Sequence, residues 1–196
     1  MGLTPVANDQ LAAVVTALEM VVRPRPSPLP ASPFRLVHWA APESERYRAL
    51  FRRVGGPWLW YSRLGMDEER LRAILDDRLV EVYAAVDRSG IEIGMVELDF
   101  RVADTCGLTY FGLIPELAGK GHGNWLMGHT LALAWRKHVR RLWVHTCTLD
   151  HPAALSFYRR HGFTPYKRTL ETFPDPRLLG LLPAETAPQI PCLASR

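Results

Sequence analysis

Long apolar runs and a basic leader are both missing from this sequence of 196 residues. No apolar stretch approaches the roughly 18 residues of a membrane-spanning helix, so we expect no association with a membrane. The first apolar stretch follows no basic segment and carries Asp9 and Glu19, which argues against a secretory signal. The sequence therefore predicts a cytoplasmic protein.

Cysteines are few as well, and clustered charge is absent. Cys106, Cys147 and Cys192 form no CxxC pair and are odd in number, which indicates reduced thiols and no disulfide framework. His145 and Cys147 share one face of an expected strand, but two ligands without a third predict no metal site. The net charge of +4 is scattered, so nucleic acid is not implied, although an anionic ligand fits.

Three regions follow from composition. Residues 1–33 form an N-terminal extension, in which Asn8 and Asp9 suggest a short helix over 11–13 and residues 14–22 favour a strand over a helix. A stiff, extended linker is expected from its prolines, which are Pro24, Pro26, Pro28, Pro30 and Pro33. Residues 34–173 form the main domain, and the tail at 174–196 is expected to be an ordered loop or a partner-facing segment.

The main domain alternates between the two hydrophobic periodicities. Alternation or short apolar runs predict strands, and 3.6-residue spacing predicts helices. The expected strands are 34–39, 80–86, 91–100, 108–114, 141–149 and 163–173, the last broken by Pro165. The expected helices are 43–54, 68–77, 124–135 and 151–161. This order predicts an α+β (mixed α/β) domain with a central, mostly antiparallel sheet.

A glycine-rich loop stands between the strand at 108–114 and the helix that follows. Gly119, Gly121 and Gly123 allow positive φ and a close approach to a ligand, and the helix start presents free N–H groups to an anion. Lys120 adds a positive charge. The spacing fits neither a Walker loop nor a dinucleotide fingerprint. The alternative is a simple turn joining a strand to a helix.

Two segments resemble the GNAT superfamily of acetyltransferases. Residues 114–124 resemble its pyrophosphate loop, Arg/Gln-x-x-Gly-x-Gly/Ala, with Gly121 and Gly123 in place and Ala118 at the Arg/Gln position. Residues 151–163 resemble the signature N-x-x-A-x-x-x-Y-x-x-x-G-F. In this second segment His151 replaces the Asn, and the matching residues are Ala154, Tyr158, Gly162 and Phe163.

The resemblance implies a fold and an activity for residues 34–173. Two splayed parallel strands would hold the pantetheine arm of acetyl-CoA, and the acetyl group would pass directly to a primary amine on a small molecule or peptide. Coenzyme A would be a co-substrate, without a metal. The coenzyme-binding residues would be Phe111, Leu113, Ile114, Gly119, Lys120, Gly121, His122, Gly123, Asn124, His151, Ala154, Phe157 and Tyr158.

Two catalytic roles are expected within that family framework. Tyr158 is the candidate acid that protonates the leaving thiolate, and its alternative is a packed aromatic residue. An acceptor ammonium with a pKa near about 10.4 must lose a proton, so a base is expected. Glu97 is the first candidate because it lies mid-strand beside the coenzyme-binding strand. Asp99 and Asp150 follow, and each of the three has a salt-bridge or surface role as its alternative.

Several assignments stay open at this level. His151 either contacts the coenzyme or caps its helix. The aromatic cluster of Trp58, Trp60 and Tyr61, with Arg63, forms an acceptor pocket, a core element or a lid. Cys147 is a minor candidate nucleophile. A non-catalytic acyl-CoA-binding module and an anion-binding interaction domain are the alternatives to an enzyme, and the oligomeric state, with a homodimer as one alternative, is open.

Overall fold

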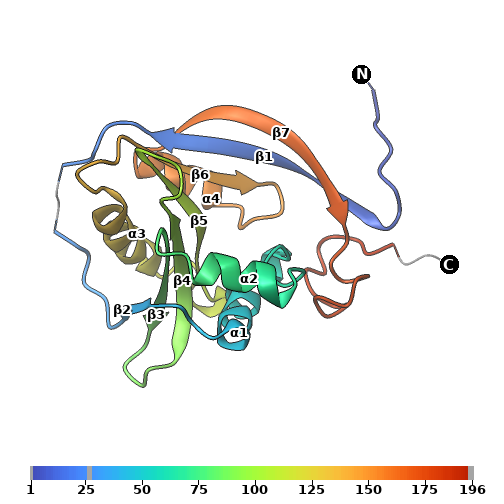
Figure 1. Cartoon of the computed structure of the whole chain (residues 1–196). Coiled ribbons are helices and arrows are strands. Elements are labelled where there is room, and N and C mark those ends of the chain that lie inside the picture. The colour runs from blue at the N-terminus through green and yellow to red at the C-terminus, as the bar shows by residue number, and fades with distance from the viewer. Residues whose placement is uncertain (1, 26–27, 194–196) are drawn as a thin grey trace.

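A computed structural model describes residues 2–25 and 28–193 as one seven-stranded sheet with helices on both sides (Figure 1). The strand order is β2-β3-β4-β5-β6-β1-β7. Helices α1 and α2 lie on one side of the central strands and α3 lies on the other. All pairings are antiparallel except that of β5 with β6. The predicted fold class is confirmed.

The element bounds agree with most of the predicted ranges. The strands are β1 (Gln10–Met20), β2 (Arg35–Trp39), β3 (Val80–Val86), β4 (Glu92–Asp99), β5 (Thr105–Leu113), β6 (Arg141–Cys147) and β7 (Thr164–Pro174). The helices are α1 (Ser44–Gly55), α2 (Glu68–Leu75), α3 (His122–Ala134) and α4 (Ala154–Arg160). In the part of the chain that is described, no helix is both long and apolar enough to span a membrane. Met1, Pro26, Ser27 and residues 194–196 lie outside the described residues, so the predicted linker is described only in part.

The sheet opens between β5 and β6. These strands pair in parallel over four positions, from Thr105 with Arg141 to Leu108 with Val144, and the pairing then stops although both strands continue. On the other edge of β5, the register with β4 shifts so that Thr109 is an extra residue. A bulge of this kind bends its strand and increases the local twist. The result is a cleft between the carboxyl-terminal halves of β5 and β6.

The short helix expected at residues 11–13 is wrong, because β1 includes that segment. Strand β1 lies between β6 and β7 and pairs with both, and Figure 1 shows it running beside β7 over most of its length. Leu18 is fully buried, and the β-branched Val14, Val15 and Thr16 suit a pleated strand. Pairing on both edges outweighs the weak helical preference of the alanines. The N-terminal extension thus contributes a strand to the same sheet as residues 35–174.

Strand β7 differs from expectation at Pro165, whereas the tail forms an ordered loop, one of the two alternatives predicted for it. The predicted break at Pro165 is absent, because a register shift there bulges Tyr166 out and β7 continues. The tail has neither helix nor strand between 175 and 193, yet it is packed. Arg177 is buried, pairs with Asp175 at 2.7 Å, and donates to the carbonyl of Ile190 at 2.8 Å. This one guanidinium therefore ties the tail to the end of β7.

Candidate active site

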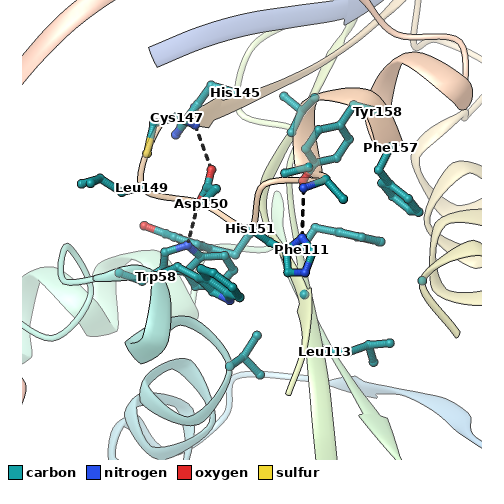
Figure 2. Close-up of a pocket in the computed structure, with 18 of the residues that line it drawn as sticks. Trp58, Phe111, Leu113, His145, Cys147, Leu149, Asp150, His151, Phe157 and Tyr158 are labelled. Carbon is teal, nitrogen blue, oxygen red and sulfur yellow. Dashed lines mark hydrogen bonds between the residues drawn. The ribbon is translucent and has the colours of Figure 1, made fainter. Parts of the chain in front are cut away.

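A cavity of about 700 Å³ occupies the cleft between β5 and β6 and extends to the aromatic cluster of Trp58, Trp60 and Tyr61 (Figure 2). Its walls come from β5, the glycine loop, the start of α3, the end of β6, α4 and the aromatic segment 58–62. Eleven of the predicted coenzyme-binding residues line it: Phe111, Leu113, Ile114, Gly119, Gly121, Gly123, Asn124, His151, Ala154, Phe157 and Tyr158. Segments separated by more than 50 residues thus meet in one cavity.

The backbone of β5 presents unpaired groups to this cavity. The N–H of Ile114 donates to the carbonyl of Ile93 on β4. Because strand residues alternate in direction, the N–H and C=O groups of Leu113 and Phe111 point away from β4, toward the cleft. On that side, the backbone of β5 beyond Leu108 pairs with no described strand. Phe111 and Leu113 therefore lack ladder partners, whereas the amide of Ile114 is already used and is not available to a coenzyme.

The glycine loop has the conformation that an anion cradle needs. Gly119 and Gly121 have φ of +73° and +81°, in the left-handed region that favours glycine, and Gly121 is the N-cap of α3. Among the described residues, no acceptor within the chain faces the N–H groups of Gly119, Gly121, His122 and Gly123. Four free amides and the positive end of a thirteen-residue helix thus converge at one end of the cavity.

Two predicted loop contacts do not line the cavity. Lys120 is exposed beside the cradle, and His122 packs against Phe34 with ring centroids 4.6 Å apart. Phe34 also contacts Trp125 on α3. The side chain of His122 thus anchors the segment after the proline-rich linker to α3, while its backbone N–H belongs to the cradle.

Tyr158 lies on α4 with its ring against Phe111 and Phe163, at centroid distances of 6.2 and 5.8 Å. The residue is 7% exposed, and its hydroxyl has no hydrogen-bond partner in the described part of the chain. Burial, and then the charge of Asp150, raise the pKa of Tyr158 above the ordinary value of 10.0. The phenol is therefore protonated at neutral pH and is able to donate a proton or a hydrogen bond into the cavity.

His151 is held in the turn ahead of α4. Its Nδ1 accepts the backbone N–H of Ala153 at 3.1 Å, just ahead of α4, and its ring contacts Trp58 edge-on at 5.1 Å. The Nδ1 is therefore the unprotonated nitrogen, and Nε2 is left for a ligand. Figure 2 shows His151 between Trp58 and the start of α4. Because Ala153 is the N-cap of α4 and no side chain caps this helix, His151 is not its cap, and its ring lines the cavity.

The end of the cavity away from the glycine loop is aromatic and acidic. Asp150 accepts hydrogen bonds from the Trp60 indole at 3.3 Å, the Thr146 hydroxyl at 2.7 Å and the Cys147 amide at 2.9 Å. Tyr110 and Ser62 join their hydroxyls at 2.5 Å on the opposite wall. These contacts fix both a carboxylate and the aromatic segment around the space that opens onto Tyr158.

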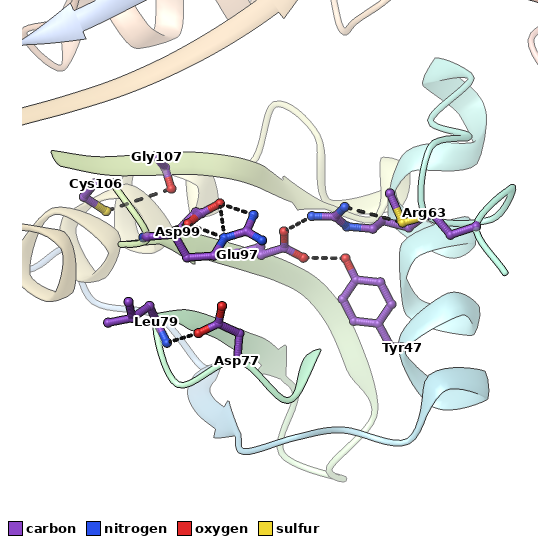
Figure 3. Close-up of polar contacts among 10 residues, drawn as sticks. Tyr47, Arg63, Asp77, Leu79, Glu97, Asp99, Cys106 and Gly107 are labelled. Atoms are coloured by element: carbon purple, nitrogen blue, oxygen red, sulfur yellow. Dashed lines mark hydrogen bonds and ion pairs between the residues drawn. The ribbon is translucent and has the colours of Figure 1, made fainter. Parts of the chain in front are cut away.

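Glu97 lies outside the cavity, in a buried ion pair (Figure 3). It is 0% exposed, receives Arg63 at 2.6 Å and accepts the Tyr47 hydroxyl at 2.5 Å. Burial alone would lower the pKa of Arg63, but the charge of Glu97 raises it above its ordinary value. Asp99 pairs with Arg101 at 2.6 Å and also lies off the cavity. Of the three candidate bases, only Asp150 faces the cavity.

Cys147 lines the cavity, but its thiol is a weak nucleophile. Burial, followed by the charge of Asp150, raises the pKa of Cys147 to about 11. The thiolate, which is the reactive form, is therefore scarce at neutral pH. This favours a transfer that does not pass through an acyl-enzyme.

Several polar residues that line the cavity were not predicted from the sequence, among them Ser62, Tyr110 and Glu171. Ser62 follows the aromatic cluster and Tyr110 lies in the predicted strand at 108–114. The sequence therefore gives their local structure, but not the hydrogen bond that joins their hydroxyls. Glu171 and Phe173 are two residues apart in β7, so their side chains lie on the same face of the strand. That face is directed to the cavity only because β7 pairs with β1. No local signal carries that information.

A sheet split at a parallel strand pair, with free backbone amides at the mouth of the split, is the arrangement that the resemblance to the GNAT superfamily implies. The family model of the acetyltransferase (GNAT) family matches residues 35–163, and the chain belongs to this family. Strands β1 and β7 lie outside the matched residues. No relative among curated proteins matches the sequence.

Solved structures show the same fold at low identity. A GCN5-related N-acetyltransferase from Sphaerobacter thermophilus is 17% identical with a TM-score of 0.58, over 83% of this chain and 52% of that one. A tandem GNAT protein from the clavulanic acid biosynthesis pathway is 20% identical with a TM-score of 0.54, over 84% and 53%. An aminoglycoside acetyltransferase from an uncultured soil sample is 17% identical with a TM-score of 0.53, over 65% and 86%. This chain thus spans about half the length of the first two.

Proposed function

We propose that the chain binds acetyl-CoA in the cleft between β5 and β6 and transfers the acetyl group directly to a primary amine. The observation that carries the proposal is the row of unpaired backbone groups at Phe111 and Leu113, which leads to the free amides of the glycine loop. Buried backbone groups need partners. The two amides of pantetheine would supply them as an added strand does, and the diphosphate would lie on the start of α3.

The transfer needs one base and one acid. We propose that Asp150, directly or through a water molecule, takes a proton from the acceptor ammonium, because it is the candidate base that faces the cavity. The neutral nitrogen attacks the thioester carbonyl, the C–N bond forms, and the C–S bond breaks. Tyr158 gives its proton to the departing sulfur, and the second proton of the attacking nitrogen leaves to water, from which Tyr158 is reprotonated. Thr109, whose hydroxyl has no partner among the described residues, lines the same cavity.

A melting experiment and a thiol-release assay test this function together. Coenzyme A should raise the melting temperature, because a ligand that binds only the folded state stabilises it. Acetyl-CoA should then release free thiol when amines are added. Binding without release for any amine would favour the alternative, a non-catalytic acyl-CoA-binding module. Absence of any melting shift would contradict the proposal.

Replacing Gly121 with valine should weaken coenzyme A binding by about 10- to 100-fold. A β-branched residue at φ +81° is strained by roughly 1–3 kcal/mol, and the loop would relax away from the cradle to relieve it. Isothermal titration with coenzyme A measures the effect. Gly90→Val is a matched control, because Gly90 has φ +85° in the β3–β4 turn, and a Cβ at either glycine meets nothing within 4 Å. Equal affinity losses in both variants would mean that the cradle is not specific.

Replacing Cys147 with alanine should leave kcat within about threefold of the wild type. Its thiol is mostly protonated at neutral pH, and direct transfer does not use it. Steady-state thiol release measures the rate, and mass spectrometry of the protein after brief exposure to acetyl-CoA detects any acetylated cysteine. Loss of turnover together with an acetyl adduct in the wild type would show that an acyl-enzyme forms.

A further inference from the structure

The acceptor end of the cavity is lined by two carboxylates and several aromatic rings, and one of the carboxylates, Glu171, is exposed to solvent. Asp150 follows β6, and Glu171 lies on β7. The surrounding rings belong to Trp58, Trp60, Tyr61, Tyr110 and Phe173. Aromatic faces attract cations, and carboxylates form charge-assisted hydrogen bonds with ammonium groups. The chemistry of these walls therefore suits a positively charged ligand.

Neither carboxylate is neutralised by the chain. Asp150 accepts only neutral donors, and Glu171 has no hydrogen bond or ion pair within the described ranges. Arg160, on α4, is the one arginine or lysine among the residues that line the cavity. Lys167 shares the face of Glu171 on β7 but lies four residues away, roughly 13 Å along the strand. Within the described residues, no basic side chain pairs with either carboxylate, so both are available to a cationic ligand.

The two carboxylates lie at different places along the cavity. Burial, and then the charge of Asp150, raise the pKa of Tyr158. Burial, and then the charge of Glu171, raise the pKa of Tyr61. The ring of Tyr61 stacks on that of Phe173 with centroids 4.7 Å apart, and Glu171 lies on the same face of β7 as Phe173. Glu171 therefore lies next to Tyr61, whereas Asp150 is held by Trp60 and the end of β6. The partner of Glu171 on β1 is Ala13, whose small side chain leaves the carboxylate accessible.

We propose that Glu171 binds a second, non-reacting ammonium group of the acceptor, so that the preferred acceptor is a diamine. This assignment rests on the proposed function. One nitrogen reacts beside Asp150 and Tyr158, while the other stays charged against Glu171 and the ring of Tyr61. Glu171 is a specificity residue in this account and takes no part in proton transfer.

The test measures binding and turnover separately. Unbranched α,ω-diamines of three to six carbons, and monoamines of the same length, are titrated calorimetrically into protein saturated with coenzyme A. The same amines are then assayed with acetyl-CoA. The wild type should bind the best diamine about tenfold more tightly than its matched monoamine, as expected for one hydrogen bond between charged groups. Glu171→Gln should remove this preference and leave monoamine binding unchanged.

Glu69→Gln is the control. It removes the same charge as Glu171→Gln, but Glu69 is exposed on α2 and does not line the cavity. It should keep the diamine preference. Equal affinity of the wild type for diamines and monoamines, or an equal loss in both amines for Glu171→Gln, would overturn the assignment. Amines that bind with the predicted preference but are not acetylated would instead refute the proposed function and leave the site of the second ammonium established.

Discussion

Replacing Tyr158 with phenylalanine should lower kcat by about 10²- to 10⁴-fold while coenzyme A binding stays unchanged. The phenol is the proton donor for the departing thiolate, and general acids contribute an effect of this size. The hydroxyl has no partner among the described residues, so its loss removes no internal hydrogen bond, and the ring contacts with Phe111 and Phe163 persist. Thiol release gives kcat, and isothermal titration gives the affinity for coenzyme A.

The control for this variant is Tyr166→Phe, which changes a half-exposed tyrosine on β7 outside the cavity. Its rate should equal that of the wild type. Because the pKa of Tyr158 is raised, the wild-type rate should also show no loss from tyrosine ionisation up to pH 10.0, the ordinary tyrosine value. Full turnover by Tyr158→Phe would remove the acid role.

Replacing Glu97 with glutamine should destabilise the fold by about 3–5 kcal/mol, because it leaves Arg63 charged and buried without its partner. For a chain of this size the melting temperature should fall by roughly 10 °C. Arg63 also lies over the ring of Tyr110, with its guanidinium carbon 5.2 Å from the centroid. The aromatic segment that lines the cavity is therefore anchored by this pair, and Glu97 acts as a positioning residue.

Two measurements separate this role from that of a base. The folded fraction of Glu97→Gln should keep the pH profile of the wild type at temperatures well below its melting point. Glu92→Gln, on the same strand, breaks a surface ion pair with Arg46 and should cost no more than about 1 kcal/mol. A Glu97→Gln protein with an unchanged melting temperature, whose lost activity returns at high pH, would restore Glu97 as the base.

Local patterns predicted most of the fold. Asp67, a residue type that favours helix N-caps, caps α2 through the Arg70 amide, and a short turn at residues 87–90 joins β3 to β4. Strand β1 was harder, since alanines and β-branched residues gave opposing signals at residues 11–22. Its final state is decided by β6 and β7, which are more than 120 residues away in sequence. Propensity alone does not contain such long-range pairing.

The candidate site divides in the same way. The glycine spacing and the position of Tyr158 are local features, and both proved to line one cavity. The choice among Glu97, Asp99 and Asp150 required knowledge of which face each side chain occupies. Glu97 lies on the α1 side, against Tyr47, and alternation along β4 did not reveal that Arg63 would neutralise it. A buried partner from a distant loop is invisible to the sequence pattern.

The most direct test of the account is a crystal structure of the protein with coenzyme A. The account predicts that the diphosphate contacts the amides of Gly119 to Gly123, that the pantetheine amides pair with the backbone of Phe111 and Leu113, and that the sulfur lies within hydrogen-bond reach of the Tyr158 hydroxyl. A coenzyme bound elsewhere, with the cleft between β5 and β6 empty, would contradict it.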